Sequence, residues 1–315
     1  MRRPSLRFIV PVSLRTAIGR ILILAFLIFL PCCAKAWNSP GHMIIAAEAW
    51  RALPPKFQKR ASELLKHHPE YPRWEKAFAG DAQGLDVDAF VFMRASTWPD
   101  EIRGSGSDYD RPHWHFIDYP LKPKSFPKES PSSTTDNALD GIAACEKSLA
   151  SSRESATIRA VSLSCLIHVI GDIHQPLHCC SLVDKAYPKG DKGGNDFFVK
   201  PGERGISLHS LWDGLLGHSA HPRSQWNEAV KIEAEYPRKS LPELNKARTP
   251  KDWSLESRTI AIEKAYLRGS LKGSTDWETA PALPAEYTRI AKAVAEKQVA
   301  LAGYRLANAI EKYLR

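Results

Sequence analysis

The chain has 315 residues, of which 43% are hydrophobic and 25% are charged, the composition of a globular protein with a sizeable core. These values exclude fibrous, disordered and multi-span membrane proteins. The 44 Lys and Arg residues outnumber the 35 Asp and Glu residues, and the formal net charge of +9 suggests a phosphate-rich partner.

Most of that positive charge lies in the first 36 residues, which hold six basic residues and no acidic one. An apolar run over 21–30 follows, and then the small-residue pattern Ala34-Lys35-Ala36. This order is typical of a secretory signal peptide, and ten apolar residues are too few for an ordinary membrane-spanning helix. We therefore expect residues 1–36 to be a signal peptide that is cleaved between Ala36 and Trp37. The remaining residues, 37–315, would form one domain of a secreted or periplasmic protein; an uncleaved membrane anchor is the alternative.

Apolar residues recur at helical spacing in much of the remaining chain. The pattern predicts helices over 44–52, 57–66, 138–150, 156–174, 208–216, 255–267 and 284–314. Only 113–117 and 195–199 resemble short strands or extended segments, and 120–135, 184–194 and 237–252 read as polar loops. The fold class is therefore expected to be mainly α, a single helical domain with short β hairpins at most.

Four cysteines remain after the expected cleavage, namely Cys145, Cys165, Cys179 and Cys180. In an exported protein they allow two disulfide bonds. The adjacent pair is a poor candidate for a bond with itself, and the sequence leaves the connectivity open.

The candidate chemistry lies in pairs of His and Asp four residues apart. His168 and Asp172 share one face of a segment, 161–173, that is apolar on nearly every side, and His209 and Asp213 repeat the spacing. For one such pair alone, a hydrogen bond along the helix is the commoner explanation. Two pairs, one of them in a helix that has no other reason to bury a carboxylate, favour a metal, and His with Asp suits zinc.

Together with these pairs, several motifs resemble those of a known family. They are Trp37, Gly41-His42, Trp98-Pro99-Asp100-Glu101-Ile102-Arg103, His115-Phe116-Ile117-Asp118, Gln175-Pro176-Leu177-His178, Gly193-Gly194-Asn195, Trp212-Asp213 and Ala302-Gly303-Tyr304-Arg305-Leu306-Ala307. Their types and order are similar to those of the secreted, three-zinc single-strand nucleases and 3′-nucleotidases (the S1/P1 nucleases). The bacterial zinc phospholipases C are a more distant resemblance with the same helical fold.

The resemblance implies three zinc ions and a ligand set for each. The first ion would be bound by Asp100, His115, His168 and Asp172. The second would be bound by His178, His209 and Asp213. The third would be bound by His42, Asp172 and the amino group and carbonyl oxygen of Trp37. Cleavage of the signal peptide would free that amino group, so one extra residue before Trp37 should remove zinc and activity.

The implied activity is endonucleolytic hydrolysis of single-stranded RNA and DNA, and of 3′-nucleotides, by a zinc-activated hydroxide that leaves 5′-phosphates. Asp100 and Asp172 would act through the metals, and Asp118 would orient the attacking water. Asn195 is a candidate substrate contact or simply a turn residue, and Phe116 could stack on a base or belong to the core. The protein is expected to be a monomer without stable membrane association. A zinc phospholipase C, and a zinc-storage protein without activity, are the rival functions.

Overall fold

The computed structural model describes residues 37–82, 84–122, 136–219 and 221–315, which lie in one compact unit, Ala34–Arg315. The expected signal peptide and most of the loop at 120–135 lie outside the described residues. No helix in the described part of the chain is long and apolar enough to cross a membrane.

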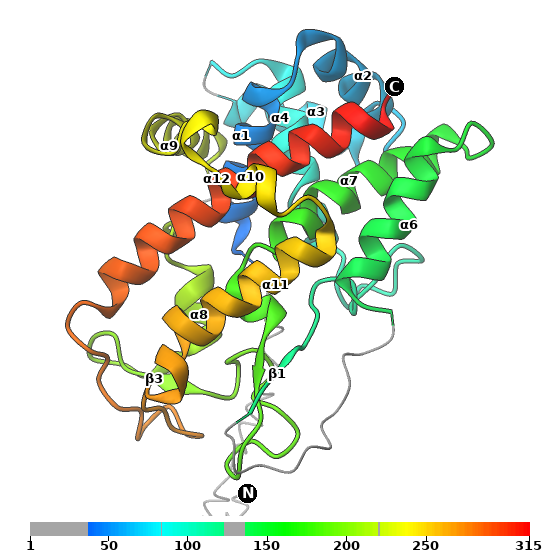
Figure 1. Cartoon of the computed structure of the whole chain (residues 1–315). Helices are drawn as coiled ribbons and strands as arrows, with labels where there is room; N and C mark the ends of the chain where they lie inside the picture. Colours follow the sequence, from blue (N-terminus) through cyan, green and yellow to red (C-terminus); the bar gives the residue numbers. More distant parts are fainter. Residues whose placement is uncertain (1–36, 83, 123–135, 220) are drawn as a thin grey trace, which may run out of the picture. The chain divides into compact units, whose positions relative to one another are not determined.

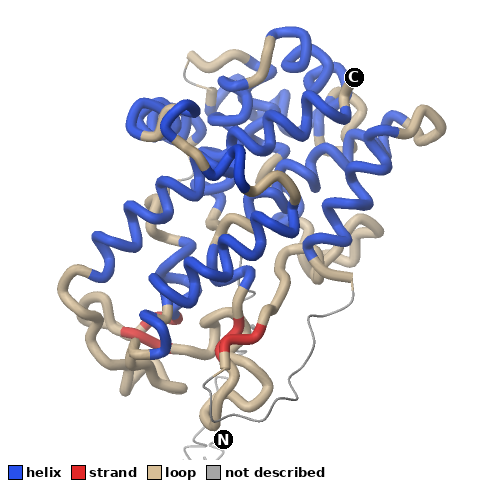
Figure 2. The backbone as a smooth tube through the Cα atoms, viewed as in Figure 1, coloured by secondary structure: helices blue, strands red, loops and turns tan. Residues whose placement is uncertain are grey.

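Helices dominate the described unit, and the strands are confined to four pieces of two residues each (Figures 1 and 2). The α-helices are α1 (Ser39–Ala52), α2 (Pro55–Leu65), α3 (Tyr71–Asp81), α4 (Val87–Ala95), α5 (Trp98–Glu101), α6 (Ala138–Ala150), α7 (Ala156–Asp172), α8 (Leu208–Asp213), α9 (Pro222–Glu235), α10 (Glu243–Lys246), α11 (Pro250–Ile260) and α12 (Tyr287–Tyr313). Shorter helical turns are η1 (Pro176–Cys179), η2 (Arg238–Ser240), η3 (Ala261–Ala265, π-helical) and η4 (Leu267–Gly269). The prediction of a mainly α fold is confirmed.

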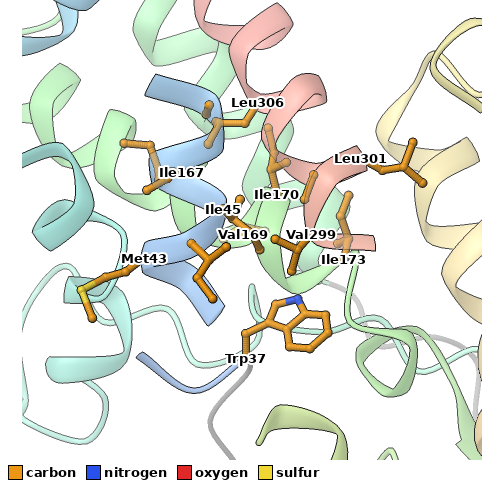
Figure 3. Packing of buried hydrophobic residues seen from close by; sticks show 14 of the residues in the cluster. Trp37, Met43, Ile45, Ile167, Val169, Ile170, Ile173, Val299, Leu301 and Leu306 are labelled. Atoms are coloured by element: carbon orange, nitrogen blue, oxygen red, sulfur yellow. The ribbon is translucent and has the colours of Figure 1, made fainter. Parts of the chain in front are cut away.

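The long helix α12 crosses the core against α1, and α7 lies beneath both (Figure 3). Gly303 makes the crossing possible, because a Cβ at this position would lie 2.4 Å from the Cβ of Glu48 on α1. Ile45, Ile170 and Val299 meet where the three helices pack, and all three side chains are fully buried. Apolar packing thus fixes the positions of α1 and α7, the two helices that carry candidate ligands.

Of the two alternatives expected at 113–117, a short strand or an extended segment, the strand does not form: residues 113–115 lie in a turn, and 116–117 have no regular secondary structure. Its backbone groups bond outside a sheet: the Ile117 amide donates to the carbonyl of His178 at 2.8 Å, and the Phe116 carbonyl accepts from Ala138 at 3.1 Å. Strand β1 (Pro120–Leu121) begins only after this segment and pairs in parallel with β2 (Ser181–Leu182). Strands β3 (Phe198–Val199) and β4 (Ile206–Ser207) form the antiparallel pair.

The polar connector expected at 237–252 contains η2, α10 and the start of α11, and α9 precedes it without having been predicted. Helix α9 buries only Pro222, Gln225, Ala229 and Ile232, so its apolar stripe is too thin to stand out in the sequence.

Candidate metal centre

Helix α7 places the first His and Asp pair in the interior, where both side chains are fully buried. The ring of His168 donates its Nδ1 proton to the carbonyl of Ser96 at 2.7 Å. Nε2 is then the nitrogen that faces Oδ2 of Asp172 at 3.2 Å. Burial lowers the pKa of His168, but the charges of Asp172 and Asp100 outweigh it and raise that pKa to about 9, so a metal would take the place of the Nε2 proton. The bond to Ser96 therefore fixes the tautomer that can bind a metal.

The described structure gathers the predicted side chains into three clusters in which the ligand atoms lie within 4.8 Å of one another. The clusters are His42, His168 and Asp172; Asp100, His115 and His168; and His178, His209 and Asp213. His168 belongs to two of them, and Oδ2 of Asp172 lies 3.1 Å from Nδ1 of His115 in the neighbouring cluster. The first two clusters therefore form one continuous group.

Several buried atoms in the clusters lack a hydrogen-bond partner among the described residues: both ring nitrogens of His42, Oδ1 of Asp100 and Oδ1 of Asp172. Nε2 of His42 nevertheless lies only 3.2 Å from Oδ1 of Asp172. A buried polar atom without a partner costs roughly 1–3 kcal/mol, more when it is charged. A cation between these atoms removes that cost, so the residues fit a metal.

The hydrogen bonds of the third cluster also leave it suited to bind a metal. His178 donates Nδ1–H to the carbonyl of His115 at 2.5 Å, and His209 donates Nδ1–H to the carbonyl of Gly193 at 2.7 Å. Nε2 of each ring is thus the nitrogen left for a metal, and the two Nε2 atoms lie 3.1 Å apart. Without a metal the two atoms can share a proton, and a cation bound by both nitrogens can take its place.

The titration states suit metal ligands as well. Burial, followed by the charge of His168, lowers the pKa of His42, and burial together with His209 lowers the pKa of His178 to about 3. Burial alone would raise the pKa of Asp172, but the surrounding histidines outweigh it and hold that pKa well below its usual value. His42 and His178 are thus neutral and Asp172 is ionised, the forms that coordinate metals.

Trp37 lies beside the first cluster, fully buried between α1 and α7 (Figure 3). Its indole Nε1 donates to the carbonyl of Gly171, the residue before Asp172, at 3.1 Å. A Cβ at Gly41 would lie 2.8 Å from the Cβ of Trp37, so a glycine is needed for this approach. The position is compatible with the predicted role of Trp37, and the role of its amino group stays a prediction.

A cavity of about 220 Å³ opens beside the clusters. It is lined by Arg103, His115, Phe116, Asp118, Leu177, His178, Lys192, Asn195 and His209. Burial, with a contribution from the charge of Asp191, raises the pKa of Asp118 to about 6. A larger groove of about 640 Å³ between α11 and α12 contains none of the clustered side chains.

Comparison with known proteins identifies the family of the chain. The family model described as S1/P1 Nuclease matches residues 37–315. The chain belongs to the S1/P1 nuclease family. It is 25% identical to Endonuclease 4 of Arabidopsis thaliana, with 95% of each chain covered, and 26% identical to Endonuclease 3 of the same plant, again with 95% of each covered. It is 24% identical to Nuclease P1 of Penicillium citrinum, over 88% of this chain and 97% of that one.

Family membership makes the chain a nuclease, a metal-dependent hydrolase of ester bonds, and does not favour the phospholipase alternative. In this S1/P1 nuclease, the predicted contacts Phe116, Asp118 and Asn195 all line the cavity. The sequence interpretation gave Arg103 and Lys192 no role, although Arg103 stands one helical turn after Asp100 and lies 3.7 Å from its Oδ1. That spacing was the available signal for Arg103.

His174, six residues after His168, lies outside the clusters. Its Nδ1–H donates to the carbonyl of Ile170 at 2.7 Å, and its Nε2 accepts from Arg305 on α12 at 2.8 Å. Burial and the charge of Arg305 hold the pKa of His174 well below its usual value. This histidine therefore joins the end of α7 to α12 and is neutral.

Proposed function

We propose that the chain is a zinc-dependent endonuclease and 3′-nucleotidase that hydrolyses single-stranded RNA and DNA and leaves 5′-phosphates. The observation that carries the proposal is the set of three His and Asp clusters beside one small cavity. Two clusters share His168, and the third is joined to them by the bond from His178 to the carbonyl of His115. Three ions bound in this way would lie close enough to act on one phosphate. His and Asp ligands without a cysteine favour zinc.

When bound, the ions would supply Lewis acidity and lower the pKa of a water molecule from 15.7 to about 7. The protein's own groups would bind the phosphate and position the water. The Arg103 guanidinium lies at the cavity wall, where it can bind a phosphate oxygen and oppose the negative charge that builds up during hydrolysis. Asp118, with its pKa near 6, can accept a hydrogen bond from the attacking water and hold it in line.

The size of the cavity supports a preference for single strands. A space of about 220 Å³ admits a phosphate and one nucleoside more readily than a base-paired duplex. Phe116 offers an aromatic face at the wall on which an unpaired base can stack. The assignment of the leaving group to the 3′-oxygen rests on the family resemblance.

We further propose that the signal peptide is cleaved before Trp37 and that the mature monomer acts outside the cytoplasm. The family match begins at Trp37, which supports this boundary. The indole of Trp37 bonds to the carbonyl of Gly171, the residue before the ionised Asp172, so Trp37 lies beside the first cluster.

The structure shows all four cysteines of the described chain as free thiols. The Cys145 thiol on α6 donates a hydrogen bond to Cys165 on α7, and both are buried. We propose that oxidation joins this pair: the two thiols lose two protons and two electrons to a disulfide oxidant, such as oxidised glutathione, which is reduced to two thiols. Cys179 instead donates to the carbonyl of Ile173.

The experiment is an assay of the zinc-loaded mature protein on single-stranded DNA, RNA, double-stranded DNA, 3′-AMP and phosphatidylcholine. Hydrolysis of the single strands and of 3′-AMP, with 5′-phosphate products from the polymers, is the expected result. Cleavage of the lipid alone would contradict the proposal. Binding of zinc without hydrolysis of any substrate would support the storage alternative instead.

A further inference from the structure

One wall of the cavity is a turn, Asp191–Asn195, with an unusual backbone. Lys192, Gly193 and Gly194 follow one another with positive φ values of 54°, 63° and 81°. The left-handed conformation is unfavourable for lysine and persists only where surrounding contacts enforce it. Lys192 and Asn195 both line the cavity, so whatever holds the turn also shapes the substrate wall.

Asp191, which is not among the residues that line the cavity, holds the turn in place. Its side chain is fully buried, and its Oδ1 accepts from the Leu182 amide at 2.9 Å and from the Ser181 hydroxyl at 3.2 Å. Its Oδ2 accepts from the Tyr266 hydroxyl at 2.7 Å, and the Gly194 amide is a further donor. All four donors are neutral, so this carboxylate is buried at a cost in free energy that needs an explanation.

The other side of the turn contacts the third cluster. The Gly193 carbonyl accepts the Nδ1–H of His209 at 2.7 Å, and the Gly194 carbonyl accepts the His209 amide at 3.2 Å. A Cβ at Gly193 would lie 2.4 Å from the carbonyl oxygen of Leu177, the residue before His178. The turn is thus packed between the two histidines of the cluster, and its carbonyl decides which nitrogen of His209 is protonated.

We infer that Asp191 and Tyr266 are positioning residues for His209 and for the cavity wall. Tyr266, 1% exposed, holds Asp191, which fixes the turn, and the turn presents the Gly193 carbonyl to the His209 ring. The ring then directs its Nε2 at His178 and Asp213. Groups that orient a metal-binding histidine in this way typically change metal affinity about 10–100-fold when they are lost. The inference rests on the proposed role of His209 as a metal ligand.

The test compares Tyr266→Phe and Asp191→Asn with the wild type. The readouts are zinc affinity, measured by competition with a chromophoric chelator, and the visible spectrum of the cobalt-substituted protein. We expect Asp191→Asn to weaken zinc binding at the His209 site by about 10–100-fold, and Tyr266→Phe to weaken it several-fold, both with an altered cobalt spectrum. Tyr266→Phe removes a single oxygen, so it keeps the test decisive if Asp191→Asn does not fold.

Three further variants distinguish failure of the positioning role from failure of the proposed metal site. Tyr71→Phe, which removes a hydroxyl bonded to Glu75 on α3, and Asp184→Asn, which removes a carboxylate that caps the amides of Ala186 and Tyr187, should bind zinc like the wild type. His209→Ala should lose one zinc equivalent. If it binds zinc like the wild type, the proposed metal site is wrong. If it loses zinc while Asp191→Asn and Tyr266→Phe melt at a lower temperature without zinc but keep wild-type affinity and spectrum, the positioning role is overturned.

Discussion

The Nε2 atoms of His178 and His209 face each other at 3.1 Å, and Nδ1 of each ring donates to a backbone carbonyl. Both Nε2 atoms are therefore held in place for one cation, and binding of that cation should add to the stability of the folded protein. Removal of metal by a chelator should therefore lower the unfolding temperature, and zinc should restore it in proportion to the logarithm of its concentration.

A matched variant sharpens that expectation. In His178→Ala, one of the two facing nitrogens is lost, so the metal-free variant should be less stable than the metal-free wild type, and zinc should stabilise it less than the wild type. Differential scanning calorimetry with and without zinc measures both effects. Equal stabilisation of the two proteins by zinc would show that no ion binds between the rings.

The amino terminus offers a second prediction. Protein that begins at Trp37 should bind one more zinc ion than protein that carries a single alanine before Trp37, because an amide nitrogen in a peptide bond does not ligate zinc. Metal analysis per chain and the rate of hydrolysis of 3′-AMP measure the difference. Removal of the alanine by an aminopeptidase is the control and should restore both. Full zinc content and activity in the extended protein would rule out the amino group as a ligand.

Glu48 on α1 provides a pH prediction away from the metal clusters. Burial, and then the charge of Glu233, raises its pKa from 4.5 to about 8, and neither carboxyl oxygen has a hydrogen-bond partner in the described structure. Between pH 4.5 and 8 the folded protein keeps a proton on this group that the unfolded chain releases. The free energy of unfolding should therefore decrease as pH rises through that window, by up to about 1.4 kcal/mol per pH unit.

Glu48→Gln should remove this part of the pH dependence and be more stable than the wild type above pH 8. Urea unfolding at several pH values measures it as a difference between the two proteins, in which the contribution of the histidines cancels. Glu203→Gln, at an exposed loop position, is the control and should leave the profile unchanged. A constant difference between Glu48→Gln and the wild type across the range would contradict the raised pKa.

The fourth prediction concerns the thiols of Cys145 and Cys165. Protein refolded with reduced and oxidised glutathione should contain this single disulfide, detected as a cross-linked peptide by mass spectrometry. The bond closes a loop of about 20 residues, which corresponds to about 3 kcal/mol in the chain-entropy account. Cys145→Ser should then melt several degrees lower than the oxidised wild type but close to the reduced protein. Alkylation of both thiols after denaturation of the oxidised sample would exclude the pairing.

Prediction from the sequence was most accurate where the residues of a single element form the telling pattern. Helix α7 is apolar on nearly every side, so its burial and the exceptional position of His168 and Asp172 could be read directly. His42 and His115 needed the family resemblance, because their partners come from elements far away in the chain. The short strand expected over 113–117 failed for the same reason: the carbonyl of His178 and the amide of Ala138 bind its backbone groups, and local alternation contains no trace of either.

The burial of Asp191 could not be predicted from the sequence. In the sequence it is one charge in a loop of Lys and Gly residues, for which an exposed position is the ordinary expectation. Its burial depends on Tyr266, 75 residues later, which follows η3. Only the folded chain shows that the two residues meet.

The backbone also links the clusters to one another. His178 donates its ring proton to the carbonyl of His115 and accepts the amide of Ile117 at its own carbonyl, so each histidine holds the other's segment in place. An ion that orders one segment therefore prepares the ligand of the next ion. The sites would then share a coupling free energy, so a variant that loses one zinc ion should also bind the neighbouring ion more weakly.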